Sequence, residues 1–195
     1  MRKSKAETAR TRERILEAAG SQFLTHGLTD AGLTRVMKAA GLTNGGFYRH
    51  FASKDELIAE ACRKALATLT ADLESQARNQ SAKQELPKVT GSYVSRNHRD
   101  HPATGCPLAF LGSELARADL RTRQEATEGL LRIARLIARG LKHIPAQKAE
   151  AQSLAIVAAM VGAVTLARIV PDSRISNSIL AATRAQILKS TRGKG

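Results

Sequence analysis

Apolar residues recur along the chain with the spacing of an α-helix, and almost none of the sequence alternates as a strand would. Residues 7–26 show the pattern well, because their apolar side chains share one helical face while charged ones lie elsewhere: Ile15, Leu16, Ala19, Phe23 and Leu24. Gly27 is a typical helix end. The pattern predicts an all-α protein whose first helix ends near residue 26.

Two short helices are expected to follow. One covers residues 33–40, with Asp30 as a cap at its entry. Thr43 is predicted to cap a third helix of about seven residues, which turns Phe47 and Phe51 inward. Two short helices joined by a tight turn form a helix-turn-helix pattern.

Longer helices are predicted for the rest of the chain. Ser53, followed three residues later by Glu56, is a capping box that opens a fourth helix to about Arg78. A polar connector is expected over residues 79–85 and a loop around residues 98–107. Further helices are predicted near residues 86–97, 107–118, 121–142, 148–170 and 174–191.

The charge balance predicts a polyanionic partner. The 195 residues include 31 Lys and Arg against 17 Asp and Glu, a net charge of +14, which suits nucleic acid or an anionic membrane. Residues 1–65 hold 12 basic and 7 acidic residues, and residues 66–195 hold 19 and 10, so both parts are basic. In the second part, four basic residues are spaced like one solvated helix face, or like a site for an acidic ligand or a further DNA contact: Arg132, Arg135, Arg139 and Lys142.

Several other classes of protein are not indicated. The uncharged run from Ser153 to Ala167 is shorter than the roughly 20 residues of a membrane span, so we expect a buried helix. The charged N-terminus predicts no signal peptide and a cytoplasmic protein. Two cysteines are too few for a disulfide framework or a four-ligand zinc site. The sequence shows no enzyme motif, and nothing in it requires a metal or a cofactor.

The third predicted helix carries groups suited to DNA. Asn44 can form paired hydrogen bonds with adenine, and Tyr48 and His50 offer hydrogen bonds to phosphate. Gly45 and Gly46 are poor helix formers, which a close approach of the backbone to a groove wall would explain.

Basic residues surround this helix. Arg49 and Lys54 lie on it or just after it, and others precede or begin the first helix, where they are placed to flank a duplex: Lys3, Lys5, Arg10 and Arg12.

The stretch from Val36 to Leu57 closely resembles the TetR/AcrR family of transcriptional regulators. The likeness covers roughly residues 10–60 and is carried by the motif Gly-x-Phe-Tyr-x-His-Phe-x-Ser-Lys-x-x-Leu, read from Gly45. It implies an all-α homodimer with an N-terminal DNA-binding domain and a variable C-terminal ligand-binding domain. Most members are repressors that release a palindromic operator when a small molecule binds.

The resemblance gives domain boundaries and contact residues. It implies a helix-turn-helix DNA-binding domain at residues 1–53 and a helical effector-binding and dimerisation domain at residues 54–195. The family's DNA contacts carry over to Thr43, Asn44, Gly45, Tyr48, His50 and Lys54. Ala31 and Gly32 stand where many relatives cap the second helix with Ser or Thr, so Thr34 or Asp30 would replace that contact.

The C-terminal domain has two predicted surfaces. Small and apolar residues of the last two helices would form a four-helix dimer interface: Leu154, Ala155, Val157, Ala159, Val161, Gly162 and Ile179. The alternative is that they face the domain's own core. An effector pocket is expected around helices that border it in this family, at Tyr93, His98, His101, Cys106, Phe110, Leu111 and Glu114.

Two alternative functions stay open. Cys106 precedes a proline at a predicted helix start, which favours a thiolate, so oxidation or alkylation there could be the signal; Cys62 is expected to be a small buried hydrophobe. A basic protein that binds DNA without sequence preference is the other alternative.

Overall fold

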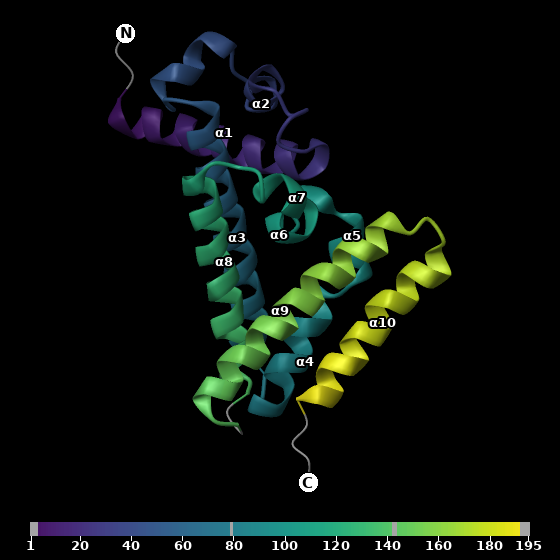
Figure 1. Ribbon diagram of the computed structural model, residues 1–195. Coiled ribbons are helices and arrows are strands. Elements are labelled where there is room, and N and C mark those ends of the chain that lie inside the picture. Colours follow the sequence, from purple (N-terminus) through teal and green to yellow (C-terminus); the bar gives the residue numbers. More distant parts are fainter. Residues whose placement is uncertain (1–3, 79, 142–143, 192–195) are drawn as a thin grey trace. The chain divides into compact units, whose positions relative to one another are not determined.

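A computed structural model describes the chain at residues 4–78, 80–141 and 144–191, and all regular structure in these ranges is helical (Figure 1). The prediction of an all-α fold with an N-terminal helix-turn-helix is confirmed. The helices form two compact units: unit 1 contains residues 1–66 and 102–127, and unit 2 contains residues 67–101 and 128–195. Two long helices, α3 (Lys54–Arg78) and α8 (Leu120–Arg139), each contribute to both units.

Unit 1 begins with the three predicted helices, α1 (Lys5–His26), α2 (Leu33–Ala39) and the 3-10 helix η1 (Asn44–Arg49). Ser4 caps α1, because its Oγ accepts a hydrogen bond from the backbone N–H of Glu7 at 3.1 Å. The first helix is therefore confirmed and starts two residues earlier than expected.

An aromatic pair anchors η1 in the core of unit 1. Phe47 and Phe51 are 1% and 2% exposed, and their rings stack with centroids 5.7 Å apart. Val36 and Met37 of α2 are also fully buried. Burial of a phenylalanine contributes about 1.5–3 kcal/mol, so this pair fixes η1 against α2.

The turn between α2 and η1 requires glycine. Gly41 has φ +67°, and the N–H of Leu42 donates to the carbonyl of Met37 at 2.9 Å. A Cβ at residue 41 would also lie 3.1 Å from Nη2 of Arg14, which donates to the carbonyl of Ala40. Both the backbone conformation and the space favour a residue without a side chain.

The predicted cap of α2 is wrong, and that of η1 is right in its position but not in its hydrogen bond. Gly32, not Asp30, occupies the N-cap of α2, and Asp30 is exposed. Thr43 is the N-cap of η1, but its side chain makes no capping hydrogen bond. The first turn of η1 is instead closed through the backbone, from the N–H of Gly46 to the carbonyl of Thr43 at 3.2 Å, as a 3-10 helix requires.

The capping box before α3 is confirmed. The N–H of Glu56 donates to Oγ of Ser53 at 3.0 Å, and Oε2 of Glu56 accepts from the N–H of Ala52 at 2.6 Å. The carboxylate thus binds one residue earlier than in the usual box. α3 ends at Arg78, as predicted.

The helix predicted over residues 107–118 is broken. After the short 3-10 helix η2 (Pro102–Thr104), the chain forms α6 (Pro107–Phe110) and α7 (Gly112–Leu115). Leu111 separates them with φ −122° and ψ 12°, outside the helical region. Gly112 follows, and a glycine disfavours continuation of a helix, which explains why the apolar periodicity overestimated its length.

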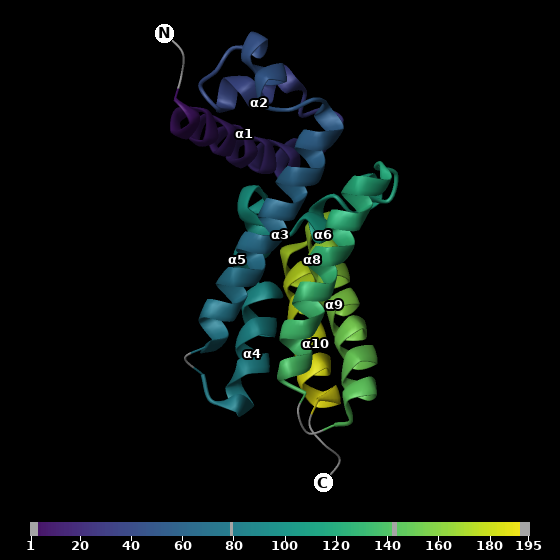
Figure 2. The same ribbon diagram turned by 90° about the vertical axis from the view of Figure 1, so that its left-hand side faces the viewer.

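Unit 2 contains α4 (Ala82–Tyr93), α5 (Arg96–Asp100), α9 (Ala146–Ile169) and α10 (Ser173–Ser190). The views in Figures 1 and 2 show α9 and α10 side by side, and α10 also contacts α4. α4 starts inside the predicted connector, and α5 occupies the predicted loop, so both of those expectations are wrong in detail.

α9 has one buried and one exposed face. Its buried residues include Ile156, Met160 and Val164, at 4%, 0% and 0% exposure. The helix is long and apolar enough to cross a membrane, but these residues pack in unit 2 as those of a core helix do. The expectation of a buried helix therefore holds for one face and is wrong for the other.

Candidate nucleic-acid interface

The start of η1 is open to solvent. Thr43, Asn44 and Gly45 are exposed, and Gly46 is half-buried. A Cβ at residue 45 would meet no atom within 4 Å, and one at residue 46 would meet only Cε of Met37 at 3.9 Å. No contact among the described residues therefore requires glycine at these two positions, and a close approach to an outside surface would explain both.

Asn44 is oriented by a neighbouring side chain. Its Nδ2 donates to Oγ1 of Thr34, on α2, at 2.7 Å, and both residues are exposed. The second N–H and the Oδ1 of the amide remain available, and these are the two groups that read adenine in the major groove. The structure thus brings together two of the residues that the sequence predicted.

The next three predicted residues differ in exposure. The Tyr48 side chain is 73% exposed, and its ring meets the edge of Phe47 with centroids 5.1 Å apart. Arg49 is exposed, whereas His50 is half-buried. A phenol held by a buried ring is a rigid donor, which suits a contact to phosphate.

Lys54 has a structural contact that the sequence did not suggest. Its Nζ donates to the backbone carbonyl of Leu28, in the loop between α1 and α2, at 2.6 Å. An ammonium group has three N–H donors, so this bond leaves others for a phosphate.

The basic residues of α1 separate into two kinds. Lys5 and Arg10 are exposed, as a flank for a duplex requires, while Lys3 lies outside the described residues. Arg12 is part of the protein's own structure: Nη2 donates to Oε1 of Glu60 at 2.7 Å, and the guanidinium lies 4.5 Å from the ring centroid of Phe51. The expectation of a duplex-flanking role for Arg12 is therefore not supported by its position.

Glu60 is the centre of a charged cluster in unit 1. Besides Arg12, the guanidinium groups of Arg121 and Arg63 lie 3.5 Å and 4.0 Å from its carboxylate. The hydrogen bond from Arg12 is the main cause that lowers the pKa of Glu60, against the opposite effect of burial. The same bond raises the pKa of Arg12. The cluster fixes α1 to α3 and α8 beside η1.

The predicted effector residues fall in both units. In unit 2, Tyr93 and His98 are buried with ring centroids 4.5 Å apart, and Nδ1 of His98 lies 2.7 Å from the carbonyl of Tyr93. Burial is the main cause that lowers the pKa of His98, against the opposite effect of the hydrogen bond to Tyr93. His101 is exposed.

The other four predicted effector residues belong to unit 1. Phe110 covers Gly105, where a Cβ would lie only 2.2 Å from the ring, and Leu111 is buried. Glu114 binds backbone N–H groups of the loop between α1 and α2. Cys106 is the N-cap of α6 with 0% exposure.

Both cysteines are buried, and neither forms a disulfide. Cys62 is 5% exposed, as expected of a small buried hydrophobe, and this burial raises the pKa of its thiol to about 12. The full burial of Cys106 shields its sulfur from solutes.

The basic face predicted on α8 is not uniformly solvated. Arg135 is exposed, and Arg139 pairs with Glu74 at 2.9 Å. Nε and Nη2 of Arg132, by contrast, are shielded from solvent and have no hydrogen-bond partner among the described residues. The expectation is wrong for Arg132, and Lys142 lies outside the described residues.

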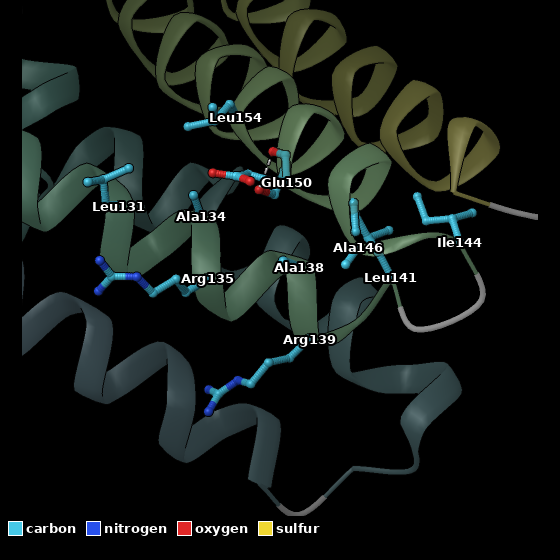
Figure 3. Close-up of a pocket in the computed structure, with 12 residues that line it drawn as sticks. Leu131, Ala134, Arg135, Ala138, Arg139, Leu141, Ile144, Ala146, Glu150 and Leu154 are labelled. Atoms are coloured by element: carbon cyan, nitrogen blue, oxygen red, sulfur yellow. Dashed lines mark hydrogen bonds between the residues drawn. The ribbon is translucent and has the colours of Figure 1, made fainter.

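A groove of about 680 Å³ lies between α8 and α9 (Figure 3). Its wall is mainly apolar, and Figure 3 shows Arg135 and Arg139 extending from α8 on the side away from α9. None of the predicted effector residues lines this groove.

The predicted dimer residues lie mostly on the exposed face of α9. Leu154, Ala155 and Ala159 are exposed, Val161, Gly162 and Ile179 are half-buried, and Val157 is buried in the core of unit 2. The same face continues to Leu166 and Ile169, at 53% and 68% exposure, which sequence reasoning missed. Continuing the helical spacing from Gly162 by four and then three residues would have found both.

The segment that forms this interface resembles a known protein family. Residues 15–61 match the family model for bacterial regulatory proteins of the tetR family. The helix-turn-helix segment is therefore similar to the tetR family over residues 15–61. The matched segment contains α2, η1, the turn at Gly41 and the start of α3.

Named relatives match stretches of similar length. The HTH-type transcriptional repressor BepR of Brucella suis biovar 1 (strain 1330) is 45% identical over 58 residues, 30% of this chain and 28% of BepR. The HTH-type transcriptional regulator SrpR of Pseudomonas putida is 42% identical over 57 residues, 29% of this chain and 27% of SrpR. The match thus spans under a third of the length of either relative.

The tetR-family fold extends over the whole chain. A TetR-family transcriptional regulator from Cytophaga hutchinsonii superposes with a TM-score of 0.81 at 21% identity, covering 100% of both chains. At that identity the comparison shows the fold of the C-terminal region and nothing of its ligand.

Proposed function

We propose that the protein is a sequence-specific DNA-binding transcriptional regulator that acts as a repressor and is released by a small-molecule effector. One observation carries the DNA-binding part: an exposed Thr34–Asn44 pair presents an oriented amide at the start of η1, and buried Phe47 holds η1 from behind. A rigid amide on an exposed helix start reads base edges in the major groove.

Recognition would divide between base and phosphate contacts. Asn44 would read a base, while Tyr48, Arg49 and Lys5 bind the backbone on either side. The bare backbone at Gly45 would lie against the groove wall, where a side chain would hold η1 away. His50, Lys54 and Thr43 would add contacts to the flanking phosphates.

Two copies are needed for a palindromic operator. The exposed apolar face of α9, with Leu154, Ala159 and Leu166, offers a surface on which a second copy can pack, and Ile175 of α10 extends it. In such a homodimer, two η1 helices would enter successive major grooves roughly 34–36 Å apart.

Unit 2 supports an anionic effector. Two guanidinium nitrogens of Arg132 are shielded from solvent and have no hydrogen-bond partner among the described residues. Burying such groups without partners costs free energy, and a ligand with a carboxylate or phosphate would supply the missing hydrogen bonds. Arg132 is therefore our candidate for the residue that binds the effector's anionic group. The buried pair of Tyr93 and His98 is a further candidate lining in the same unit.

The redox alternative has less support. Cys106 lies at a helix start, as that alternative requires, but its sulfur is fully buried and would have to be exposed before an oxidant or electrophile could reach it.

Selection of bound sequences from random duplex DNA, at about 150 mM salt, tests the proposed function. We expect enrichment of a palindrome, and Asn44→Ala should relax the preference at one base pair in each half-site. Tyr48→Phe is the matched variant: it should weaken binding to all sequences without changing the preference. If no sequence is enriched, the protein binds DNA through its positive charge without sequence preference, and the proposal is overturned.

A further inference from the structure

The loop between α1 and α2 is held by a carboxylate from a distant part of the chain. Oε2 of Glu114, on α7, accepts hydrogen bonds from the backbone N–H of Leu28 at 2.7 Å and of Thr29 at 3.3 Å. The three residues belong to unit 1, although 86 residues separate Leu28 from Glu114 in sequence. This is a tertiary contact between the helix-turn-helix and the segment that carries α6 and α7.

A second charged group holds the same residue from the other side. Nζ of Lys54 donates to the carbonyl of Leu28 at 2.6 Å. Both backbone polar groups of Leu28, which is 8% exposed, are therefore bound by ionised side chains from α7 and α3. Hydrogen bonds to ionised groups are shorter and stronger than neutral ones, so the position of this loop is closely defined.

The preceding residue leaves space for the carboxylate. Gly27 has φ +86°, and a Cβ there would lie 3.0 Å from Oε1 of Glu114. A side chain at residue 27 would therefore displace the carboxylate as well as strain the backbone.

The loop determines where α2 begins. α2 starts at Leu33, and Thr34, in its first turn, accepts the hydrogen bond that orients Asn44. A shift of Leu28 would therefore move the Thr34–Asn44 pair. On the other side, Glu114 lies on a four-residue helix that follows the break at Leu111, so its position depends on the packing of α6.

We propose that Glu114 is a positioning residue, through which the segment carrying α6 and α7 sets the base-reading pair for operator recognition. The proposal rests on the DNA-binding function proposed above. When α7 keeps its carboxylate on Leu28 and Thr29, the Thr34–Asn44 pair is in register with the bases. Movement of α7 away from this loop releases α2 and reduces selective binding, so the contact is a point at which a signal can act on recognition.

The test compares Glu114→Ala and Glu114→Gln with Asp119→Ala. Asp119 is a matched control in the same unit, because its carboxylate also makes two hydrogen bonds, to N–H and Oγ1 of Thr122 at 3.0 Å and 2.7 Å, but does not touch the helix-turn-helix. Each variant is titrated with the selected operator and with a scrambled duplex, at a temperature where circular dichroism shows all of them folded.

We expect Glu114→Ala to bind the operator about tenfold more weakly, with little change on scrambled DNA, because phosphate contacts do not depend on the register of α2. Glu114→Gln keeps an acceptor oxygen and should lie between wild type and Glu114→Ala. Asp119→Ala should match wild type. The amide protons of Leu28 and Thr29 should exchange faster in Glu114→Ala alone.

Three results would overturn the proposal. The first is that Glu114→Ala binds the operator as tightly as the wild type does. The second is that Glu114→Ala and Asp119→Ala lose the same operator affinity, which would mean general destabilisation. Parallel losses on operator and scrambled DNA would show that base reading is not affected. If the wild type selects no sequence at all, the proposed function fails first and this proposal with it, whereas failure of Glu114→Ala alone leaves the proposed function standing.

Discussion

At the scale of single residues, the proposed interface contains a glycine, Gly45, that no contact among the described residues requires. A Cβ at residue 45 would meet nothing within 4 Å, and its backbone φ is not positive. We expect Gly45→Ala to leave the free energy of unfolding unchanged or to raise it by up to about 1 kcal/mol, since alanine is the better helix former.

The same substitution should weaken DNA binding, because the methyl group holds η1 away from the groove wall. Chemical denaturation and operator titration of one preparation measure both effects. Gly20→Ala, on α1 and also without atoms near its Cβ, is the matched control and should not change affinity. Unchanged operator affinity in Gly45→Ala would mean that the backbone does not approach the groove at this point.

Glu60 gives the stability of unit 1 a defined acid dependence. The hydrogen bond from Arg12 is the main cause that lowers the pKa of Glu60 in the folded protein. The contribution of Glu60 to the free energy of unfolding is therefore complete above the ordinary glutamate pKa of about 4.3, and it is lost as the pH falls through the lowered pKa. We expect Glu60→Gln to lose about 1–3 kcal/mol of unfolding free energy at pH 7.

The loss should shrink below about pH 4, where the wild-type carboxylate becomes protonated as well. Denaturation curves from pH 7 to pH 3 measure it, with Glu128→Gln, an exposed carboxylate on α8, as the control that should change by less than about 0.5 kcal/mol. A pH-independent difference would show that the ion pair is not the origin of the effect.

Arg132 should behave as a residue that is kept for a ligand rather than for stability. Arg132→Met removes two shielded nitrogens that have no hydrogen-bond partner among the described residues, so we expect the free energy of unfolding to rise by about 1 kcal/mol. Arg135→Met, at an exposed neighbour, should have almost no effect. Urea titration measures the free energy of unfolding of both variants. A clear loss of stability in Arg132→Met would assign Arg132 a structural role and remove the argument for an anionic effector.

At the scale of helices, the sequence predicted the long elements and the helix-turn-helix well, and the short helices between residues 96 and 115 poorly. α1, α3, α9 and α10 have strong periodicity and clear ends, because helix caps and apolar spacing are local properties. The break at Leu111 depends on how Phe110 packs over Gly105, a contact that no local pattern reveals.

In the candidate site, too, local features could be predicted from the sequence and tertiary contacts could not. The motif identified the residues of η1, including Asn44, and the structure adds how they are held. The Thr34–Asn44 hydrogen bond follows from the packing of α2 on η1, and the contact of Glu114 with Leu28 joins segments 86 residues apart. Glu114 was predicted as an effector residue from its neighbourhood in sequence, and its partner could not be foreseen without the fold.

The exposed face of α9 makes a prediction at this scale. Leu166 is 53% exposed, so a charge there should leave the fold intact but prevent a second copy from packing on this face. We expect Leu166→Glu to be monomeric by size-exclusion chromatography with light scattering, where the wild type is dimeric. Gln124→Glu, on an exposed position of α8, should remain dimeric. A dimeric Leu166→Glu protein would place the interface elsewhere.

At the scale of the whole molecule, positive charge is spread over the chain, yet only part of it has a role in the proposed complex. Residues 66–195 carry a net charge of +9, more than the +5 of residues 1–65, where the interface lies. Counterion release distinguishes basic residues that contact phosphates from those that do not. The logarithm of affinity falls with the logarithm of salt concentration, with a slope of about 0.9 for each phosphate neutralised.

We therefore expect Lys5→Gln and Arg49→Gln each to reduce the salt slope by about 2 per dimer, one phosphate for each copy. Arg174→Gln and Lys189→Gln, equally exposed but on α10, should leave the slope unchanged, because they lie in unit 2 and outside the interface. Operator titrations between about 50 and 200 mM salt give the four slopes. If the α10 variants reduce the slope as much as the others, the basic C-terminal region also binds the duplex, and the interface proposed around η1 is only part of the DNA-binding surface.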